Sequence, residues 1–154
     1  MQGREAGVPP AAAWLGGFGA VPFVGLAVAL VLPVGMPREL LGQALAGYGA
    51  VILSFMGAIH WGLAIAPGAS VGGDALSSRL VGSVVPPLIG LGALLVPPTI
   101  GFLVLAAAFA GLLGIDLRAT RRGLAPAWYP KLRVPLTVTV VAALLVAAIA
   151  LRVA

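Results

Sequence analysis

Five long apolar segments constrain this chain more than any other feature. They span approximately residues 14–34, 40–66, 80–96, 99–116 and 134–153. At a helical rise of about 1.5 Å per residue, each segment can cross a hydrocarbon core of roughly 30 Å, the third and fourth only just. Isolated strands would leave backbone groups without partners in lipid, so each segment is expected to be helical. We therefore predict an all-α integral membrane bundle of five transmembrane helices, forming one domain over residues 1–154.

Composition supports this assignment and excludes several classes of function. Only 8% of the residues are charged and 61% are hydrophobic, whereas soluble domains have about 25% charged residues. The net charge of +5 is not arranged as a basic patch interleaved with aromatic residues, so nucleic acid is not an expected partner. Cysteine is absent, which excludes disulfides and thiolate chemistry. The lipid bilayer is the first expected partner.

The distribution of lysine and arginine predicts the orientation of the five spans. One side of the predicted bundle holds seven of these residues: Arg4, Arg79, Arg118, Arg121, Arg122, Lys131 and Arg133. The other side holds two, Arg38 and Arg152. Because cytoplasmic loops are enriched in Lys and Arg, we predict a cytoplasmic N-terminus and an external C-terminus. The expected location is the inner (cytoplasmic) membrane of a bacterium.

The only histidine, His60, lies in the second apolar segment, within GAIHWGLAI at residues 57–65. A polar group inside the membrane is a functional candidate by default. Its ring is expected either to bond a backbone carbonyl or Asp116, or to help bind a small hydrophobic molecule such as a quinone or lipid. A haem site would need a second axial ligand, and a proton relay would need mid-membrane acids. We therefore predict no cofactor and no metal site.

Prolines inside two spans suggest where a pocket near His60 would form. Pro22 and Pro86-Pro87 lie at about the depth of His60, roughly 10 Å below the cytoplasmic interface by helix rise. Each proline frees a carbonyl one turn earlier, and we expect His60 or Ser83 to donate to these groups. The candidate polar cluster of this pocket comprises His60, Trp61, Arg79, Ser83, Asp116 and Arg118.

The longest polar segment, RATRRGLAPAWYPKLR at residues 118–133, has two interpretations. A plain determinant of topology is favoured over a docking site for anionic lipid or an acidic partner. If it docks a partner, the candidate residues are Trp128, Tyr129, Lys131 and Arg133. Pro135 is expected in the first turn of the fifth helix.

Small residues recur at every fourth position of the second segment, from Gly42 to Ala66. Such a ridge lets another helix approach closely in lipid. We expect it to pack within the protein in preference to packing against a partner.

Two stretches carry a resemblance to a known family: YGAVILSFMGAIHWGLA at residues 48–64 and DLRATRRGLAPAWYPKLRVPLT at residues 116–137. The chain resembles a domain-of-unknown-function family of small membrane proteins that includes transmembrane protein 69. The resemblance implies a multi-span protein of bacterial inner membranes, with no established activity. The phrase WYPKLRVP is also similar to one in the tryptophan-rich sensory proteins, which bind porphyrins and sterols, but it sits elsewhere in the chain.

These observations favour a non-catalytic function. The leading hypothesis is an accessory or assembly subunit of a larger respiratory or photosynthetic membrane complex, with other membrane subunits as partners. The alternative is a binding protein for a quinone, lipid or tetrapyrrole in a pocket near His60. An enzyme is not expected, because no nucleophile with a base and an orienting group is recognisable.

Overall fold

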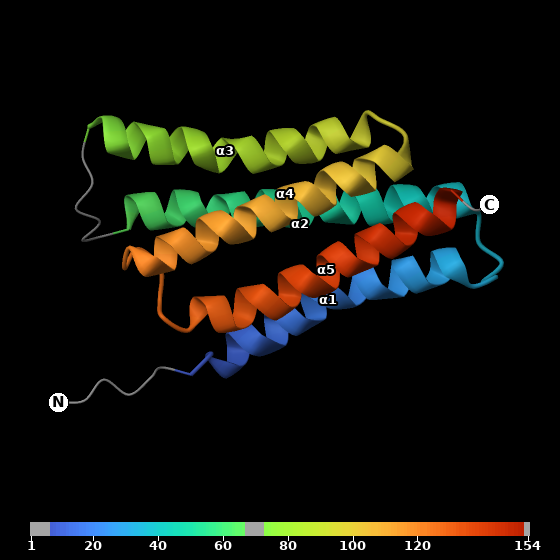
Figure 1. The fold of residues 1–154 in the computed structure, drawn as a ribbon, viewed down its shortest axis with the longest axis horizontal. Helices are drawn as coiled ribbons and strands as arrows, with labels where there is room; N and C mark the ends of the chain where they lie inside the picture. The colour runs from blue at the N-terminus through green and yellow to red at the C-terminus, as the bar shows by residue number, and fades with distance from the viewer. Residues whose placement is uncertain (1–6, 67–72, 153–154) are drawn as a thin grey trace.

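The computed structural model describes residues 7–66 and 73–152, and all regular structure in these ranges is helical (Figure 1). Each helix is long and apolar enough to cross a membrane. The predicted all-α architecture is therefore confirmed for these ranges, and the length and composition of the helices suggest a multi-pass membrane protein. The helices are α1 (Pro10–Val31), α2 (Arg38–Ile65), α3 (Asp74–Leu94), α4 (Pro98–Arg121) and α5 (Tyr129–Arg152).

The helices extend beyond the apolar segments that predicted them. The fourth was expected to end at residue 116, but α4 continues to Arg121; the fifth was expected from residue 134, but α5 begins at Tyr129. Pro135 therefore lies inside α5 and not in its first turn, whereas Pro130 occupies the first turn, where proline is tolerated. Hydropathy identifies only the apolar part of a helix. Polar turns at the ends of α4 and α5 keep helical backbone geometry, so these helices are longer than their apolar segments.

Consecutive helices run antiparallel, and the bundle has two chemically different ends (Figure 1). α1 runs beside α5, α2 packs against α3, and α4 packs against α5 and crosses α2. We call one end, where α2 and α4 finish and α3 and α5 begin, the basic end. Its described basic residues are Arg79, Arg118, Arg121, Arg122, Lys131 and Arg133. The opposite end holds Arg38 and Arg152; Arg4 lies outside the described residues.

Aromatic rings hold the centre of the bundle. Phe23 of α1 is fully buried and packs edge-on against Tyr48 of α2 and Phe109 of α4, with ring centroids 5.1 and 5.8 Å apart. Edge-to-face pairs of this kind are favourable beyond the area they bury. The outward faces of the helices remain apolar, with exposed Val and Leu side chains such as Val51 and Leu88. An apolar exterior of this kind suits a hydrocarbon solvent.

The small-residue ridge of α2 is divided in two. Gly42, Ala46 and Ala50 are buried, and a Cβ on Gly90 of α3 would lie only 3.2 Å from Ala50. The other half of the ridge, which includes Ala58 and Gly62, is exposed. Internal packing therefore accounts for the first half of the ridge and leaves the second half uncovered.

Candidate functional site

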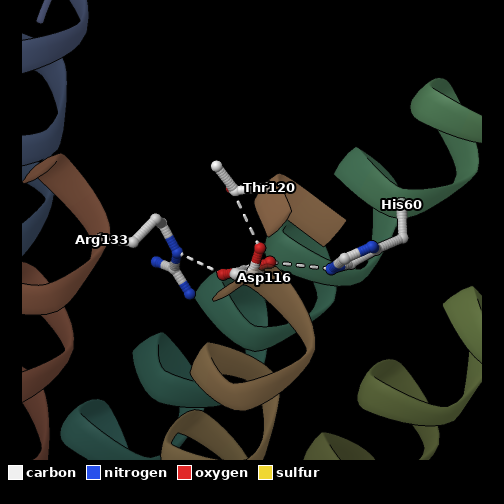
Figure 2. Close-up of polar contacts among 4 residues, drawn as sticks. All are labelled: His60, Asp116, Thr120 and Arg133. Atoms are coloured by element: carbon white, nitrogen blue, oxygen red, sulfur yellow. Dashed lines mark hydrogen bonds and ion pairs between the residues drawn. The ribbon is translucent and has the colours of Figure 1, made fainter. Parts of the chain in front are cut away.

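The carboxylate of Asp116 is the centre of a buried polar network (Figure 2). His60 Nε2 lies 2.8 Å from Asp116 Oδ1, and Arg133 Nε lies 2.6 Å from Asp116 Oδ2. Asp116 is 2% exposed and Arg133 is 5% exposed. Each carboxylate oxygen therefore has a donor of its own, and the network joins α2, α4 and α5.

Helix geometry places the three groups in one layer. His60 lies five residues before the end of α2, Asp116 five residues before the end of α4, and Arg133 four residues after the start of α5. Each is thus roughly 6–8 Å from the basic end of its helix by helical rise. The start of α5 before its apolar segment makes this alignment possible, because it puts Arg133 on a helical face.

The donor and acceptor roles follow from the chemistry of the partners. Arginine remains protonated in proteins and has no acceptor, so its contact with Asp116 is an ion pair. An ionised carboxylate only accepts, so His60 donates Nε2–H to Asp116. Buried ion pairs lose hydration that their attraction only partly replaces, and losing one partner is costly. The network therefore fixes which faces of the three helices meet.

A small apolar cluster covers the network on the side of the basic end. Ala119, Ala125 and Tyr129 are buried there, with Trp128 and Leu124 packed against them. Thr120 donates to the backbone carbonyl of Asp116 at 3.2 Å and does not touch the carboxylate. The ion pair consequently lies between this cluster and the main core, in surroundings of low polarity.

An apolar cavity of about 290 Å³ adjoins the network between α1, α2 and α5. Its lining includes Leu15 and Phe55, which are 74% and 61% exposed, so it opens on the outer surface of the bundle between α1 and α2. α1 and α2 diverge toward the basic end (Figure 1). Phe23 closes the cavity on the side of the bundle centre. Residues from four helices line it: Ala12, Leu15, Gly16, Gly19, Ala20, Phe23, Ile52, Phe55, Met56, Ile59, Phe109, Tyr129, Leu132, Arg133, Leu136, Thr137 and Val140.

Tyr129, Arg133 and Thr137 of α5 bring polar groups to this largely apolar cavity, and two of the three residues keep unsatisfied atoms. Arg133 Nη2 and Thr137 Oγ1 are buried and have no hydrogen-bond partner among the residues that the structure describes. They are four residues apart on one helical face, one turn from each other. Buried polar groups in native structures are nearly always paired, so Arg133 and Thr137 are the two residues of the cavity wall that have unused hydrogen-bonding capacity.

The pocket expected beside Pro86 does not coincide with this cavity. A Cβ on Gly57 of α2 would lie 2.7 Å from the Ser83 carbonyl oxygen and 3.2 Å from Pro86 Cβ, so α2 and α3 are in close contact there. Ser83 donates to the Leu80 carbonyl at 2.6 Å instead of to a proline-freed group. The cavity lies on the other side of α2, along Met56 and Ile59.

Near Pro22, a side chain from α2 bonds the carbonyl of Gly19, whereas the carbonyl expected to be freed by this proline is that of Phe18. Tyr48 Oη donates to the Gly19 carbonyl oxygen at 2.9 Å, in the proline-disturbed turn of α1. His60, which was considered for such a carbonyl or for Asp116, bonds Asp116. The histidine ring is therefore directed to Asp116 of α4 and not to a carbonyl near the prolines of α1 or α3.

The remaining members of the expected polar cluster lie apart from the network. Trp61 is 45% exposed on the outer surface, and Arg118 is exposed. Arg79 is half-buried, and neither Arg79 nor Arg118 forms an ion pair with another described residue. Within the described ranges, no three His, Asp or Glu residues are grouped as a metal site would require.

The expected docking residues also separate. Lys131 is exposed at the basic end, and Trp128 packs edge-on against Tyr129 with ring centroids 6.0 Å apart. Tyr129 is buried and lines the cavity. Arg133 was assigned to the interface because it precedes the apolar segment, but it lies in the interior against Asp116. It belongs with the network and not with a docking surface.

Thr137 is the site residue that sequence reasoning missed. The available signal was the spacing of Arg133, Thr137 and Val140, which places all three on one face of a helix that begins before Arg133. A helix start at residue 134 concealed this pattern.

One protein family matches most of the chain. The family described as "Protein of unknown function (DUF3429)" matches residues 8–149. The chain belongs to the DUF3429 family. The matched range of the family contains the whole network and every residue that lines the cavity. No curated protein and no solved structure matches the chain.

Asp116→Ala tests whether the network holds the helices together. The substitution leaves the Arg133 guanidinium buried without its counter-charge, and we expect the free energy of unfolding to fall by about 3–5 kcal/mol. Thermal or SDS-induced unfolding in detergent micelles measures it. Arg118→Ala, on the exposed face of the same helix, is the matched control and should change little.

A double variant separates the effect of losing the Asp116–Arg133 ion pair from the effect of burying one unpaired charge. Asp116→Leu combined with Arg133→Met removes both charges, so it should be more stable than Asp116→Ala alone. Equal stability of Asp116→Ala and the wild type would contradict a structural role for the network.

Proposed function

We propose that this protein is a non-catalytic membrane protein that binds a small hydrophobic molecule in the cavity between α1, α2 and α5. The observation that carries the proposal is an apolar cavity that opens on the outer surface of the bundle and is lined by two residues with unsatisfied polar atoms, Arg133 and Thr137. Ligand sites typically combine an apolar lining with a few placed polar groups. From the sequence alone, ligand binding is the alternative to a role as an accessory or assembly subunit. The cavity is the observation that favours ligand binding.

The opening supports entry from the bilayer. The exposed side chains of Leu15 and Phe55 lie at its rim, where lipid tails surround the bundle. A hydrophobic molecule dissolved in the membrane therefore needs no aqueous path to reach the site. The absence of a side chain at Gly19 leaves room in the cavity wall, since a Cβ there would meet nothing within 4 Å.

The network supports a binding role over catalysis. Both oxygens of Asp116 accept from fixed donors, and the Nε2 atom of His60 is engaged with one of them. A general base must reach the proton that it abstracts, and neither group is among the residues that line the cavity. The proposed role of the network is to position Arg133 at the cavity wall.

Filling the cavity tests the proposal. Gly19→Leu places a large side chain in the cavity, whereas Gly17→Leu places the same side chain on the exposed surface of α1. Mass spectrometry of the intact protein, purified in mild detergent, should find roughly one hydrophobic molecule per chain in the wild type and in Gly17→Leu. Gly19→Leu should lack it. An empty wild-type protein, or equal loading of Gly19→Leu, refutes the proposed function.

An accessory or assembly subunit of a membrane complex is the second candidate. The exposed half of the α2 ridge, including Ala58 and Gly62, favours it, because small residues permit close approach of a partner helix. Gly62→Leu would then release partner subunits that co-purify in gentle detergent. Recovery of the wild-type protein only as a monomer or homodimer opposes this candidate.

The proposed orientation places the basic end in the bacterial cytoplasm, in keeping with the excess of Lys and Arg there. We also propose, from the resemblance of residues 48–64 and 116–137, that the family includes transmembrane protein 69.

The cysteine-free chain makes the orientation simple to measure. Ala127→Cys lies in the connection between α4 and α5, and Met36→Cys lies at the opposite end of the bundle; both positions are exposed. An impermeant maleimide applied to intact spheroplasts should label Met36→Cys and should label Ala127→Cys only after lysis. The reverse pattern inverts the topology.

A further inference from the structure

Resting on the proposed function, we infer that the ligand presents a neutral carbonyl oxygen to Arg133 and Thr137. Such a ligand has an apolar body and an uncharged hydrogen-bond acceptor at one end. Quinone rings and the ester groups of membrane lipids share this chemistry.

The two unsatisfied atoms determine whether the ligand group must accept or donate hydrogen bonds. Arg133 Nη2 only donates hydrogen bonds, so its partner must be an acceptor. The Thr137 hydroxyl rotates to donate or accept. A carbonyl oxygen has two lone pairs and accepts from both groups at once. A donor-only group, such as an ammonium, would leave Arg133 unpaired and bring two cations together.

The contact with Asp116 fixes the direction of the guanidinium. Its Nε is held at 2.6 Å from Asp116 Oδ2, on the side that faces α4. Figure 2 shows the two terminal nitrogens of Arg133 beyond Nε, one of them directed away from Asp116. Because the guanidinium is planar and rigid, one engaged edge leaves the others set for a second acceptor. Asp116 therefore acts on the ligand through Arg133 and is a positioning residue.

Charge balance decides between a neutral carbonyl and a carboxylate. Within residues 7–66 and 73–152, Arg133 is the only charged residue that lines the cavity, and Asp116 already neutralises it. A carboxylate ligand would add a second negative charge to the same apolar layer without a second fixed cation. Burial of an uncompensated charge is far more costly than burial of a hydrogen-bonded carbonyl. The site therefore favours an ester or quinone over a fatty acid.

The volume of the cavity limits the size of the ligand group that it can hold. About 290 Å³ is at the lower limit of small-molecule sites, which span roughly 300–1,000 Å³. A single ring or the ester region of a lipid suits this size, with the tail leaving between α1 and α2. A tetrapyrrole, which was among the ligands expected from the sequence, is disfavoured by its larger ring system.

Thr137→Val provides a nearly isosteric test, because it removes only the unsatisfied hydroxyl. Thr139→Val is the matched control: it lies two residues along α5, and its hydroxyl bonds the Pro135 carbonyl outside the cavity. The intact delipidated protein is titrated separately with a short-chain benzoquinone, a diester phospholipid, its diether analogue and a long-chain fatty acid. Native mass spectrometry reports the dissociation constants.

The inference predicts that Thr137→Val weakens binding of the preferred carbonyl probe about 3- to 10-fold, with Thr139→Val unchanged. Preference for the quinone identifies a quinone site; preference for the diester over the diether identifies a lipid carbonyl. Binding of the fatty acid or the diether as tightly as the carbonyl probes overturns the inference, as does an unaltered affinity in Thr137→Val. Gly19→Leu keeps the two proposals distinguishable: if it blocks every probe while Thr137→Val has no effect, the cavity binds ligands but the carbonyl assignment is wrong.

Discussion

The ion pair between Asp116 and Arg133 is the contact on which the rest of this structure depends. In an apolar layer neither charge is stable alone, so α4 and α5 are constrained to present these two residues to each other. His60 adds α2 to the arrangement through the second carboxylate oxygen. Three helices thereby acquire fixed rotations about their axes, a specificity that interchangeable Leu and Val contacts do not supply.

The cavity follows from how α1 is attached to this unit. α1 lies close against α5 at Gly16, where a Cβ would be 2.8 Å from Leu136 Cδ1, and it is tied to α2 through the Tyr48–Gly19 hydrogen bond. Toward the basic end α1 follows α5 and diverges from α2 (Figure 1). The apolar cavity lies between these three helices, and its lining includes Arg133 and Thr137 of α5. The same helix thus supplies the ion pair on one side and the polar wall of the cavity on the other.

The sequence predicted the architecture because the membrane permits few alternatives. Apolar length alone was enough to find five helices, since only helices satisfy the backbone in lipid at this chain length. Helix ends were less predictable, because hydropathy does not register polar turns that remain helical. That error concealed the site: with α5 starting at residue 134, Arg133 belonged to a loop and had no face to share with Thr137.

Other parts of the site depended on packing that no local pattern encodes. His60 and Asp116 were predicted on the same side of the membrane, and Asp116 was one of two kinds of acceptor considered; their distance required the fold. The proline kinks suggested a pocket at the correct depth but on the wrong face of α2, because Gly57 allows α3 to pack closely there. Depth is readable from a sequence, whereas the choice of neighbouring helix is not.

An experimental structure of the full chain in a lipid nanodisc is the most direct test of this account. It should show elongated non-protein density between α1 and α2, with its polar end in hydrogen-bond contact with Arg133 and Thr137, while Asp116 holds the other edge of the guanidinium. A cavity closed by contact of α1 with α2, or an Arg133 that points to water with Asp116 unpaired, would contradict it.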